Sequence, residues 1–392
     1  MTKPDFLNAP AIQAAFRLAI QAGGEGRLVG GVVRDWLMGR PIGDIDMAVN
    51  VPIDAFCKAA EKADIRIIET GLDHGSVTMI YENDSIEITQ TRADIETDGR
   101  HAVIGFHPSF AKDASRRDFT MNAIYLNADG ALYDPLNGQE DIHAKKVVFI
   151  GNASDRITED YLRILRYVRF IATLDDIVID EGILSALTQH KQGLHHLSGE
   201  RIMQELIKLF AGPHWAKAVD VMRHTALDTT LFNEPFLDVH DMSDSLDKWQ
   251  ARVASCLSPS AFQAWQNLPV ARKDIAQINY CLASISEDDW ACLAGEAWHE
   301  IAYFEPHNGG QAGFYDRCLV QSRYHPHGLS SQRLQALRNY DAPPCPVTGH
   351  DLQKAGFEAG PEMGKVLHQA KRAFAKSAYS LSREEIIALL RS

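Results

Sequence analysis

The sequence lacks long hydrophobic runs. No window of its 392 residues holds about 18 consecutive apolar side chains, the length that a membrane-spanning helix needs. Residues 1–21 also lack the basic start and unbroken apolar core of an export signal. We therefore expect a cytoplasmic protein that has no membrane partner.

Cysteine is sparse and irregularly spaced. The six cysteines include no Cys-x-x-Cys pair, which disfavours zinc ligation, and their scatter disfavours a disulfide framework. We expect reduced thiols and assign no chemistry to them. They are Cys57, Cys256, Cys281, Cys292, Cys318 and Cys345.

Basic residues are outnumbered by acidic ones. The chain has 39 Lys and Arg against 52 Asp and Glu, a formal net charge of −13. A protein that coats nucleic acid non-specifically needs a broad basic surface, so this class is disfavoured. A local basic groove is still compatible with the charge, because the arginines are clustered. The clusters are Arg116 with Arg117, and Arg156, Arg163, Arg166 and Arg169.

The hydrophobic content of 45% and the length predict two to four packed domains. Short β-rich runs alternate with helical patterns up to about residue 152, which indicates a compact α/β unit, and helical periods dominate afterwards. Residues 94–113 are polar and lack clear periodicity, so we expect a long functional loop there. The expected strands are 27–29, 45–49, 65–69, 76–81, 85–91 and 123–127. The expected helices include 10–21, 32–38, 53–63, 159–172, 181–190, 200–210, 215–223 and 384–390.

The first candidate for chemistry is a glycine turn between a strand and a helix. In Leu28-Val-Gly-Gly-Val-Val-Arg-Asp35, Gly30 and Gly31 follow the strand and Arg34 lies in the first helical turn. Backbone N–H groups at such a turn approach phosphate oxygens closely. About half of such glycines serve the turn alone, so the pair by itself is weak. The chain has no Gly-Lys-Ser/Thr of a P-loop.

A pair of carboxylates strengthens the signal. Asp44 and Asp46 stand at the start of an apolar run, and residues i and i+2 of a strand point to the same face. Two adjacent carboxylates repel unless a cation joins them, and in phosphoryl transfer that cation is magnesium, used as two ions. Glu87, on the 85–91 strand, is a candidate third carboxylate, although a solvent-facing strand residue is the favoured interpretation.

Together these stretches resemble the class II tRNA nucleotidyltransferase and bacterial poly(A) polymerase family. Three further stretches agree, in the family's order: Arg116-Arg-Asp-Phe-Thr-Met-Asn-Ala123, Glu159-Asp-Tyr-Leu-Arg163, and Gly199-Glu-Arg-Ile202 followed by Glu205-Leu206. The four cover about the first 210 residues. They are specific as a set, although none is specific alone.

Base selection can be argued from the residues themselves. Asp160 and Arg163 are three apart, so on a helix they share a face and offer a carboxylate acceptor beside guanidinium donors. Cytosine and adenine present an amino donor next to a ring-nitrogen acceptor and match this pair, whereas uracil and guanine present the reverse. An isolated pair with this spacing is more often a surface ion pair. The accompanying motifs favour nucleotide selection without a template.

The resemblance implies further site residues. Arg117 would reach the triphosphate or sugar and Asp118 the ribose, with a plain helix start around Asp118 as the alternative. Arg166 and Arg169 would bind the nucleotide, or else form structural salt bridges. The implied activity is addition of C, C and A to the 3′ end of tRNA from CTP and ATP, with two Mg²⁺ ions.

The resemblance also implies a fold: an α/β, polymerase-β-like nucleotidyltransferase head with a small mixed sheet, followed by an all-α neck, body and tail. We place the head at 1–152, the neck at 153–225, the body at 226–320 and a tRNA-binding tail at 321–392. In the tail, the basic residues form a candidate RNA face, and a solvated helix explains them nearly as well. They are Lys365, Lys371, Arg372 and Lys376.

Three alternative functions stay open. Poly(A) polymerase shares the catalytic motifs, but we would expect it to carry a basic extension, and this chain is acidic. A partial enzyme that adds only CC or only A has the same motif order. A non-catalytic tRNA-binding module would have no need for Asp44 and Asp46.

Overall fold

The computed structural model of the chain describes residues 3–72, 75–97, 102–239, 245–295, 298–304, 310–323, 325 and 328–391. It forms two compact units, Met1–Leu197 and Ser198–Ser392. The first unit is α/β and the second is helical, which confirms the expected fold class. Among the described helices, none is long and apolar enough to cross a bilayer.

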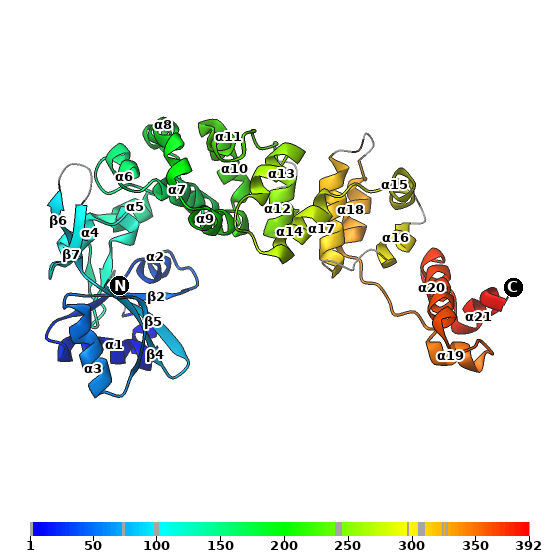
Figure 1. Cartoon of the computed structure of the whole chain (residues 1–392), viewed down its shortest axis with the longest axis horizontal. Helices are drawn as coiled ribbons and strands as arrows, with labels where there is room; N and C mark the ends of the chain where they lie inside the picture. Colours follow the sequence, from blue (N-terminus) through cyan, green and yellow to red (C-terminus); the bar gives the residue numbers. More distant parts are fainter. Residues whose placement is uncertain are drawn as a thin grey trace. The chain divides into compact units, whose positions relative to one another are not determined.

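The first unit is built on a seven-stranded mixed sheet with the strand order β3-β4-β5-β2-β1-β8-β9 (Figure 1). Strands β2 and β5 are parallel, and the other neighbours in the sheet are antiparallel. The strands are β1 (Gly26–Val29), β2 (Ile45–Val49), β3 (Arg66–Gly71), β4 (Ser76–Tyr81), β5 (Asp84–Gln90), β8 (Tyr125–Leu126) and β9 (Leu132–Tyr133).

Two helices cover this sheet because each has one apolar stripe. Helix α1 (Pro10–Gln21) buries Ile12, Ala15 and Ala19, contacts β1, β4 and β5, and begins with proline at its first turn. Helix α3 (Ile53–Lys62) contacts α1 and β3 (Figure 1). Both helices have the bounds expected from the sequence to within a residue, because periodicity and end signals agree.

The other described helices of this unit include those that carry the predicted motifs. They are η1 (Asp5–Asn8), α2 (Gly31–Leu37), α4 (Phe110–Ser115), η3 (Thr120–Asn122), α5 (Gly138–His143), α6 (Ala153–Glu159), α7 (Leu162–Thr173), α8 (Glu181–His190) and η4 (Lys191–His196). Phe119, Phe149 and Tyr167 pack as a buried aromatic group between the end of the sheet and α7.

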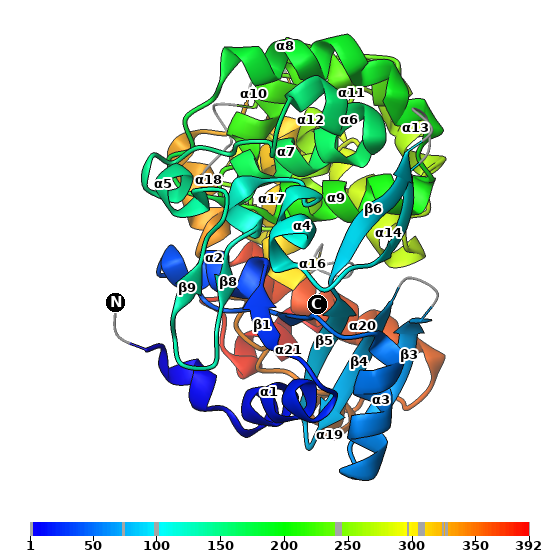
Figure 2. The same cartoon turned by 90° about the vertical axis from the view of Figure 1, so that its left-hand side faces the viewer.

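The prediction of a long loop over residues 94–113 is wrong. Strands β6 (Arg92–Thr97) and β7 (Ala102–Phe106) form a two-stranded ladder of their own, and α4 follows (Figure 2). A register shift between Asp94 and Glu96 interrupts the alternation that identifies a strand in sequence. Residues 98–101 of this segment lie outside the described residues.

The prediction of one helix over residues 159–172 is also wrong at its start. Helix α6 ends at Glu159, Asp160 is extended with φ −152° and ψ 103°, and α7 begins at Leu162. The Asp160 carboxylate accepts a hydrogen bond from the backbone N–H of Leu162 at 3.1 Å. An aspartate that satisfies the N–H groups of a new helix favours such a start over helix continuation.

The second unit is helical throughout its described part. Aromatic side chains form its first core, around Phe210, Trp215, Phe232 and Trp265. A separate cluster of Val347, Leu352, Ala370, Phe374 and Ile386 lies near the C-terminus. The helices are α9 (Gly199–Ala211), α10 (Trp215–Thr225), α11 (Leu227–Phe232), α12 (Trp249–Cys256), α13 (Pro259–Gln266), α14 (Arg272–Leu282), α15 (Glu287–Ala294), α16 (Trp298–Phe304), α17 (Gly310–Ser322), α18 (Ser331–Arg338), α19 (Gly349–Lys354), α20 (Pro361–Lys376) and α21 (Arg383–Arg391).

Candidate active site

The glycine turn meets one of the predicted carboxylates. Gly30 lies between β1 and α2 with φ 80°, a conformation that side chains other than glycine rarely adopt. A Cβ placed there would lie 3.5 Å from Asp46 Oδ2 and 4.0 Å from Arg117 Nη1. Three motifs far apart in the sequence therefore converge on the space in front of Gly30.

The two aspartates have different environments. Asp46 is half-buried on β2, whereas Asp44 is exposed in a bend one residue before that strand, so only Asp46 has strand geometry. Glu87 is the register partner of Asp46 on β5 and is exposed, as the sequence favoured. Burial first, and then the Glu87 carboxylate, raise the pKa of Asp46 to about 6, against the lowering effect of Arg117.

Two carboxylates at this position suit magnesium. The described residues contain no group of three or more His, Cys, Asp or Glu that would enclose a metal ion. Magnesium is usually held by one or two carboxylates, with water and substrate phosphates as its other ligands. The crowding of Asp44, Asp46 and Glu87, which raises the pKa of Asp46, is relieved when a cation binds. Asp44 and Asp46 therefore fit the donor set of such an ion.

The buried carboxylate of Asp113 holds the guanidinium of Arg117. Its Nε and Nη2 donate to Asp113 Oδ2 at 3.2 and 3.0 Å, and the Tyr125 hydroxyl donates to the same oxygen at 2.8 Å. Asp113 is 3% exposed. Because Nε and Nη2 bind Asp113, Nη1 remains directed at Gly30 and Asp46. Arg117 is thus presented to the site in a fixed orientation.

Asp118 lies in the turn after α4, so the structure does not have the plain helix start that was the alternative for this residue. Arg166 of α7 binds its Oδ2 through Nε at 2.6 Å and Nη2 at 2.5 Å, and Asn122 donates to Oδ1 at 3.0 Å. Burial acts to raise the pKa of Asp118, but Arg166 and Asn122 hold it below its usual range. Arg34 donates to Asn122 Oδ1 at 2.9 Å, so the ionised Asp118 is linked to the glycine turn.

A buried arginine joins the turn at residues 116–118 to the end of α6. Arg156 of α6 is 8% exposed, and its Nη2 donates to the backbone carbonyls of Arg116 and Arg117 at 2.5 Å each. Its Nη1 pairs with Glu159 at 2.5 Å, and Arg163 donates to the same carboxylate oxygen at 2.7 Å. Glu159 is therefore the acidic partner of Arg163.

The pair predicted to select the base, Asp160 and Arg163, departs from the expected geometry. Because Asp160 is extended, it does not share a helical face with Arg163. The backbone N–H of Arg163 instead donates to the Asp160 carbonyl at 3.0 Å. Arg169, further along α7, lies with its guanidinium 4.3 Å from the ring centre of Phe170.

The basic residues predicted for the tail lie on α20, in the second unit. Arg372 binds Glu300 of α16, and Lys376 lies 3.6 Å from the same carboxylate. Lys365 pairs with Glu362 at 2.8 Å, and Lys371 is half-buried on the same helix. Three of the four cations thus have an acidic partner.

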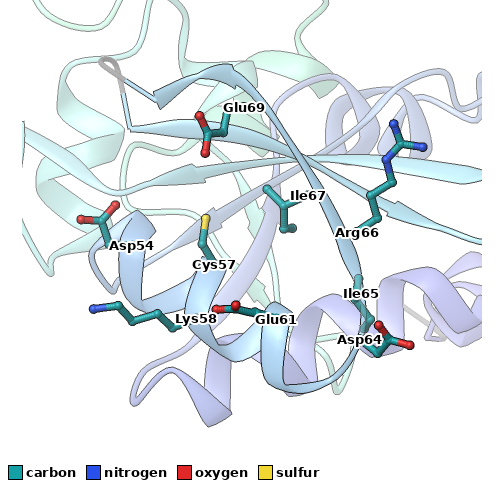
Figure 3. A pocket seen from close by; sticks show the side chains of 9 residues that line it. All are labelled: Asp54, Cys57, Lys58, Glu61, Asp64, Ile65, Arg66, Ile67 and Glu69. Carbon is teal, nitrogen blue, oxygen red and sulfur yellow. The ribbon is translucent and has the colours of Figure 1, made fainter.

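A cavity of about 570 Å³ lies elsewhere on the first unit, between α3 and the edge strand β3 (Figure 3). Asp54, Cys57 and Glu61 of α3 line it together with Arg66 and Glu69 of β3. It includes none of the predicted site residues. The convergence at Gly30, rather than the presence of a cavity, therefore locates the candidate active site.

Comparison with known proteins identifies the family. Residues 26–148 match the family described as the poly A polymerase head domain, and residues 176–240 match that described as the probable RNA and SrmB-binding site of polymerase A. The human mitochondrial CCA tRNA nucleotidyltransferase 1 is 31% identical over 100% of this chain and 92% of its own length. The chain belongs to the CCA tRNA nucleotidyltransferase family.

Other members of the CCA tRNA nucleotidyltransferase family agree. The CCA-adding enzyme of Bacillus cytotoxicus is 38% identical over 68% of this chain and 70% of its own length. The fold matches the Bacillus stearothermophilus CCA-adding enzyme in complex with CTP, with a TM-score of 0.66, 24% identity and coverage of 100% and 98% of the two chains. The Thermotoga maritima enzyme complexed with tRNA gives a TM-score of 0.69 at 20% identity, over 100% and 98%.

Sequence reasoning missed several supporting residues of this nucleotidyltransferase site. Asp113, Tyr125 and Asn122 hold Arg117 and Asp118, and Arg156 had been noted only as part of a basic cluster. Asn122 and Tyr125 follow the Arg116-Arg-Asp118 motif within seven residues, which is the one signal that the sequence offers for them. Asp113 is four residues before Arg117, so i,i+4 spacing is the signal that the sequence offers for it.

Proposed function

We propose that this protein is a template-independent RNA nucleotidyltransferase that adds C, C and A to the 3′ end of tRNA from CTP and ATP. The observation that carries the proposal is the convergence of Gly30, Asp46 and Arg117 within about 4 Å of one point. Similarity to the human CCA tRNA nucleotidyltransferase over the full chain supports the choice of tRNA and of these nucleotides. Structures of relatives named as complexes with CTP, ATP and tRNA also support it.

The catalytic roles follow from the chemistry of each group. Membership of the family implies dependence on a divalent metal, and we assign two Mg²⁺ ions to Asp44 and Asp46, with Glu87 as a candidate third ligand. Bound there, the ions supply charge neutralisation of the triphosphate and activation of the 3′ hydroxyl. Gly30 and Gly31 offer backbone N–H groups to phosphate oxygens.

Arginines and Asp118 position the nucleotide. Arg117 Nη1 faces the space in front of Gly30, where it would meet the triphosphate, and Arg34 stands beside the same turn. Asp118, kept ionised by Arg166, accepts a hydrogen bond from the ribose. Arg169 would extend this cationic row along α7.

We assign base selection to Asp160 and Arg163. The Arg163 side chain donates from Nη1 to Glu159 and to the Arg156 carbonyl, and from Nη2 to the Arg116 carbonyl at 3.5 Å. We therefore assign Nε, together with the more weakly held Nη2, as the donors to the base. The Asp160 carboxylate is the acceptor for the amino group of cytosine or adenine. Selection then depends on the extended turn between α6 and α7 rather than on one helical face.

The wider organisation is also proposed. We retain a head at 1–152, a neck at 153–225, a body at 226–320 and a tail at 321–392, with tRNA contacted by the basic residues of α20. Because Arg372 and Lys376 pair with Glu300, phosphate must compete with that carboxylate. We propose a cytoplasmic location; since the vertebrate relatives are named as mitochondrial, fractionation of the host cell decides between the compartments.

The test is single-nucleotide addition to tRNA that lacks its last three residues, with magnesium and each nucleoside triphosphate in turn. We expect two C additions, then one A, no product from UTP or GTP, and complete loss of product with EDTA. Long A runs on unrelated RNA would identify a poly(A) polymerase, a second candidate because the head domain is shared. Arrest after CC, or addition of A alone, would identify a partial enzyme.

A catalytic variant separates an enzyme from a binding module. Asp46→Ala should abolish nucleotide transfer and leave tRNA affinity unchanged, because the carboxylate binds metal and not RNA. Glu61→Gln, an exposed change on α3, serves as the control and should retain full activity. A wild-type protein that binds tRNA and never incorporates nucleotide would contradict the proposal.

A further inference from the structure

Tyr161 lies between the two residues that we assign to base selection. It directly follows the extended Asp160 and precedes α7, with φ −61° and ψ −17°. Its ring lies against Gly193 of η4, a segment 30 residues further along the chain. The same ring lies 5.9 Å from the ring of His196.

The contact with Gly193 leaves no room for a side chain. A Cβ at residue 193 would lie 2.0 Å from Tyr161 Cδ1, 2.1 Å from Cε1 and 2.4 Å from Cγ, far closer than the 3.0 Å that real Cβ atoms respect. The φ of Gly193 is not in the left-handed region, so the backbone conformation does not call for glycine. Space for the tyrosine ring is therefore what requires glycine at this position.

The segment that carries Gly193 is anchored. Gly193 and Leu194 are buried, with Leu194 0% exposed, and Leu197 donates its N–H to the Leu194 carbonyl at 3.2 Å. A side chain introduced at residue 193 would consequently displace Tyr161 rather than η4.

Displacement of Tyr161 would reach the selecting turn directly. Asp160 accepts two local hydrogen bonds across Tyr161. The N–H of Leu162 donates to its Oδ1, and the N–H of Arg163 donates to its backbone carbonyl. These bonds set the internal shape of the turn. The Tyr161 ring adds a contact between that turn and η4.

We infer that Gly193 is a specificity-positioning residue: its missing side chain seats Tyr161, and the seated ring fixes the direction in which Asp160 and Arg163 meet the base. The inference rests on the proposed assignment of base selection to these two residues. A merely structural Gly193 would affect stability and overall rate, but not the ratio between nucleotides.

The test compares Gly193→Ala, Tyr161→Ala and the double variant for kcat/KM with CTP, ATP, UTP and GTP on tRNA that lacks its 3′ CCA. Each single variant should lower the CTP-to-UTP and ATP-to-GTP ratios at least tenfold. Because Tyr161→Ala removes the ring that collides, Gly193→Ala should add no further loss in that background. Gly349→Ala is the matched control, since a Cβ there meets nothing within 4 Å.

Two results would overturn the inference: ratios within twofold of wild type in the single variants, or independent losses that multiply in the double variant. If Gly193→Ala fails to fold by thermal melting, Tyr161→Ala alone decides, because it only creates space and must still lower the ratios. A wild-type protein that adds no C or A would instead overturn the proposed function. Wild-type C, C and A addition with unchanged ratios in the variants would overturn the positioning role alone.

Discussion

At the scale of single residues, Asp46 differs from the neighbouring carboxylates in its burial. It is half-buried beside Glu87, whereas Asp44 and Glu87 are exposed. Burial and the adjacent carboxylate raise its pKa to about 6, which means that the folded protein favours a positive charge next to this group. Asp46 is therefore the carboxylate whose replacement should be felt most.

We predict a graded effect of carboxylate removal. Asp46→Asn should lower kcat by at least about 100-fold, because the carboxylate that we propose as a magnesium ligand is lost. Glu87→Gln should lower it by less than about tenfold, since an exposed third ligand is replaceable by water. Titration of activity with magnesium checks both, and equal losses in the two variants would contradict the grading.

The support of Arg117 gives a second prediction at this scale. Tyr125→Phe removes a hydroxyl that donates to Asp113 at 2.8 Å and accepts from Arg117 at 3.3 Å. Asp113 still holds Arg117, so KM for CTP should rise several-fold with kcat nearly unchanged, and unfolding free energy should fall by about 1–2 kcal/mol. Steady-state kinetics and urea unfolding measure the two effects.

Tyr133→Phe is the control for this change. Tyr133 is the register partner of Tyr125 on β9, and its ring lies 6.0 Å from that of Tyr125. Its variant should keep the wild-type KM. A comparable rise of KM in both variants would show that loss of ring packing, and not the hydroxyl contact, is responsible.

At the scale of elements, sequence reasoning succeeded where a local signal was complete. Helix α1 has proline at its start, a continuous apolar stripe and glycines after its end, and its bounds were predicted without error. The ladder of β6 and β7 was missed because a register shift at Asp94 interrupts the alternation. Asp160 was placed on a helix because periodicity continues across the break.

The residues of the candidate site also differ in whether a local signal identified them. Gly30 and Asp46 were recognisable because turn chemistry and strand alternation are local properties. The partners of Arg117 and Arg163 were missed although both pairs have i,i+4 spacing, because spacing alone does not show which of several neighbouring charges meet. Spacing alone paired Arg163 with Asp160, whereas in the structure the Arg163 side chain donates to Glu159.

The connection made by Arg156 gives a prediction for this scale. Arg156→Lys keeps the charge, but a single ammonium group does not reproduce the fork that binds two carbonyls and Glu159. We expect a loss of about 2–4 kcal/mol in the unfolding free energy and weaker CTP and ATP binding. Urea unfolding and nucleotide titration measure these effects.

Arg17→Lys, a change on α1 away from the site, is the control for Arg156→Lys. It should leave both quantities near the wild-type values. If Arg156→Lys weakens neither folding nor nucleotide binding, the hydrogen bonds to the turn after α4 are not what holds the two motifs together.

At the scale of the whole molecule, the helical unit contains a fully buried carboxyl group. Asp316, on α17 of the helical unit, is 0% exposed. Burial raises its pKa to about 7, against the effect of Lys248. Asp247 raises it as well and Arg252 lowers it, while Cys281 of α14 also faces this carboxylate.

This buried acid predicts a pH dependence of stability. Between the unfolded pKa of about 3.8 and the folded pKa of about 7, the folded protein keeps a proton that the unfolded chain has released. Stability contributed by Asp316 is therefore present below pH 4 and lost as the pH rises to 7, by roughly 4 kcal/mol at most. Asp316→Asn should gain stability relative to wild type from pH 5 to pH 8.

Urea unfolding at pH 5, 6, 7 and 8 measures this difference, with Asp288→Asn, an exposed change on α15, as the control. The control should run parallel to wild type across the range. If the unfolding free energy of Asp316→Asn also runs parallel to that of wild type from pH 5 to pH 8, the carboxylate is already ionised in the folded protein at pH 5.

The hydrogen bonds of Arg156 also bear on how this family can be recombined. The turn at residues 116–118 and the helices around Glu159 are separate in the chain, yet one buried guanidinium belongs to both. A chimera that exchanges only one of these segments with a relative would pair an arginine with carbonyls placed for another partner. We expect the crossover points of functional chimeras to fall outside residues 109–166, so that this segment is always exchanged as a whole.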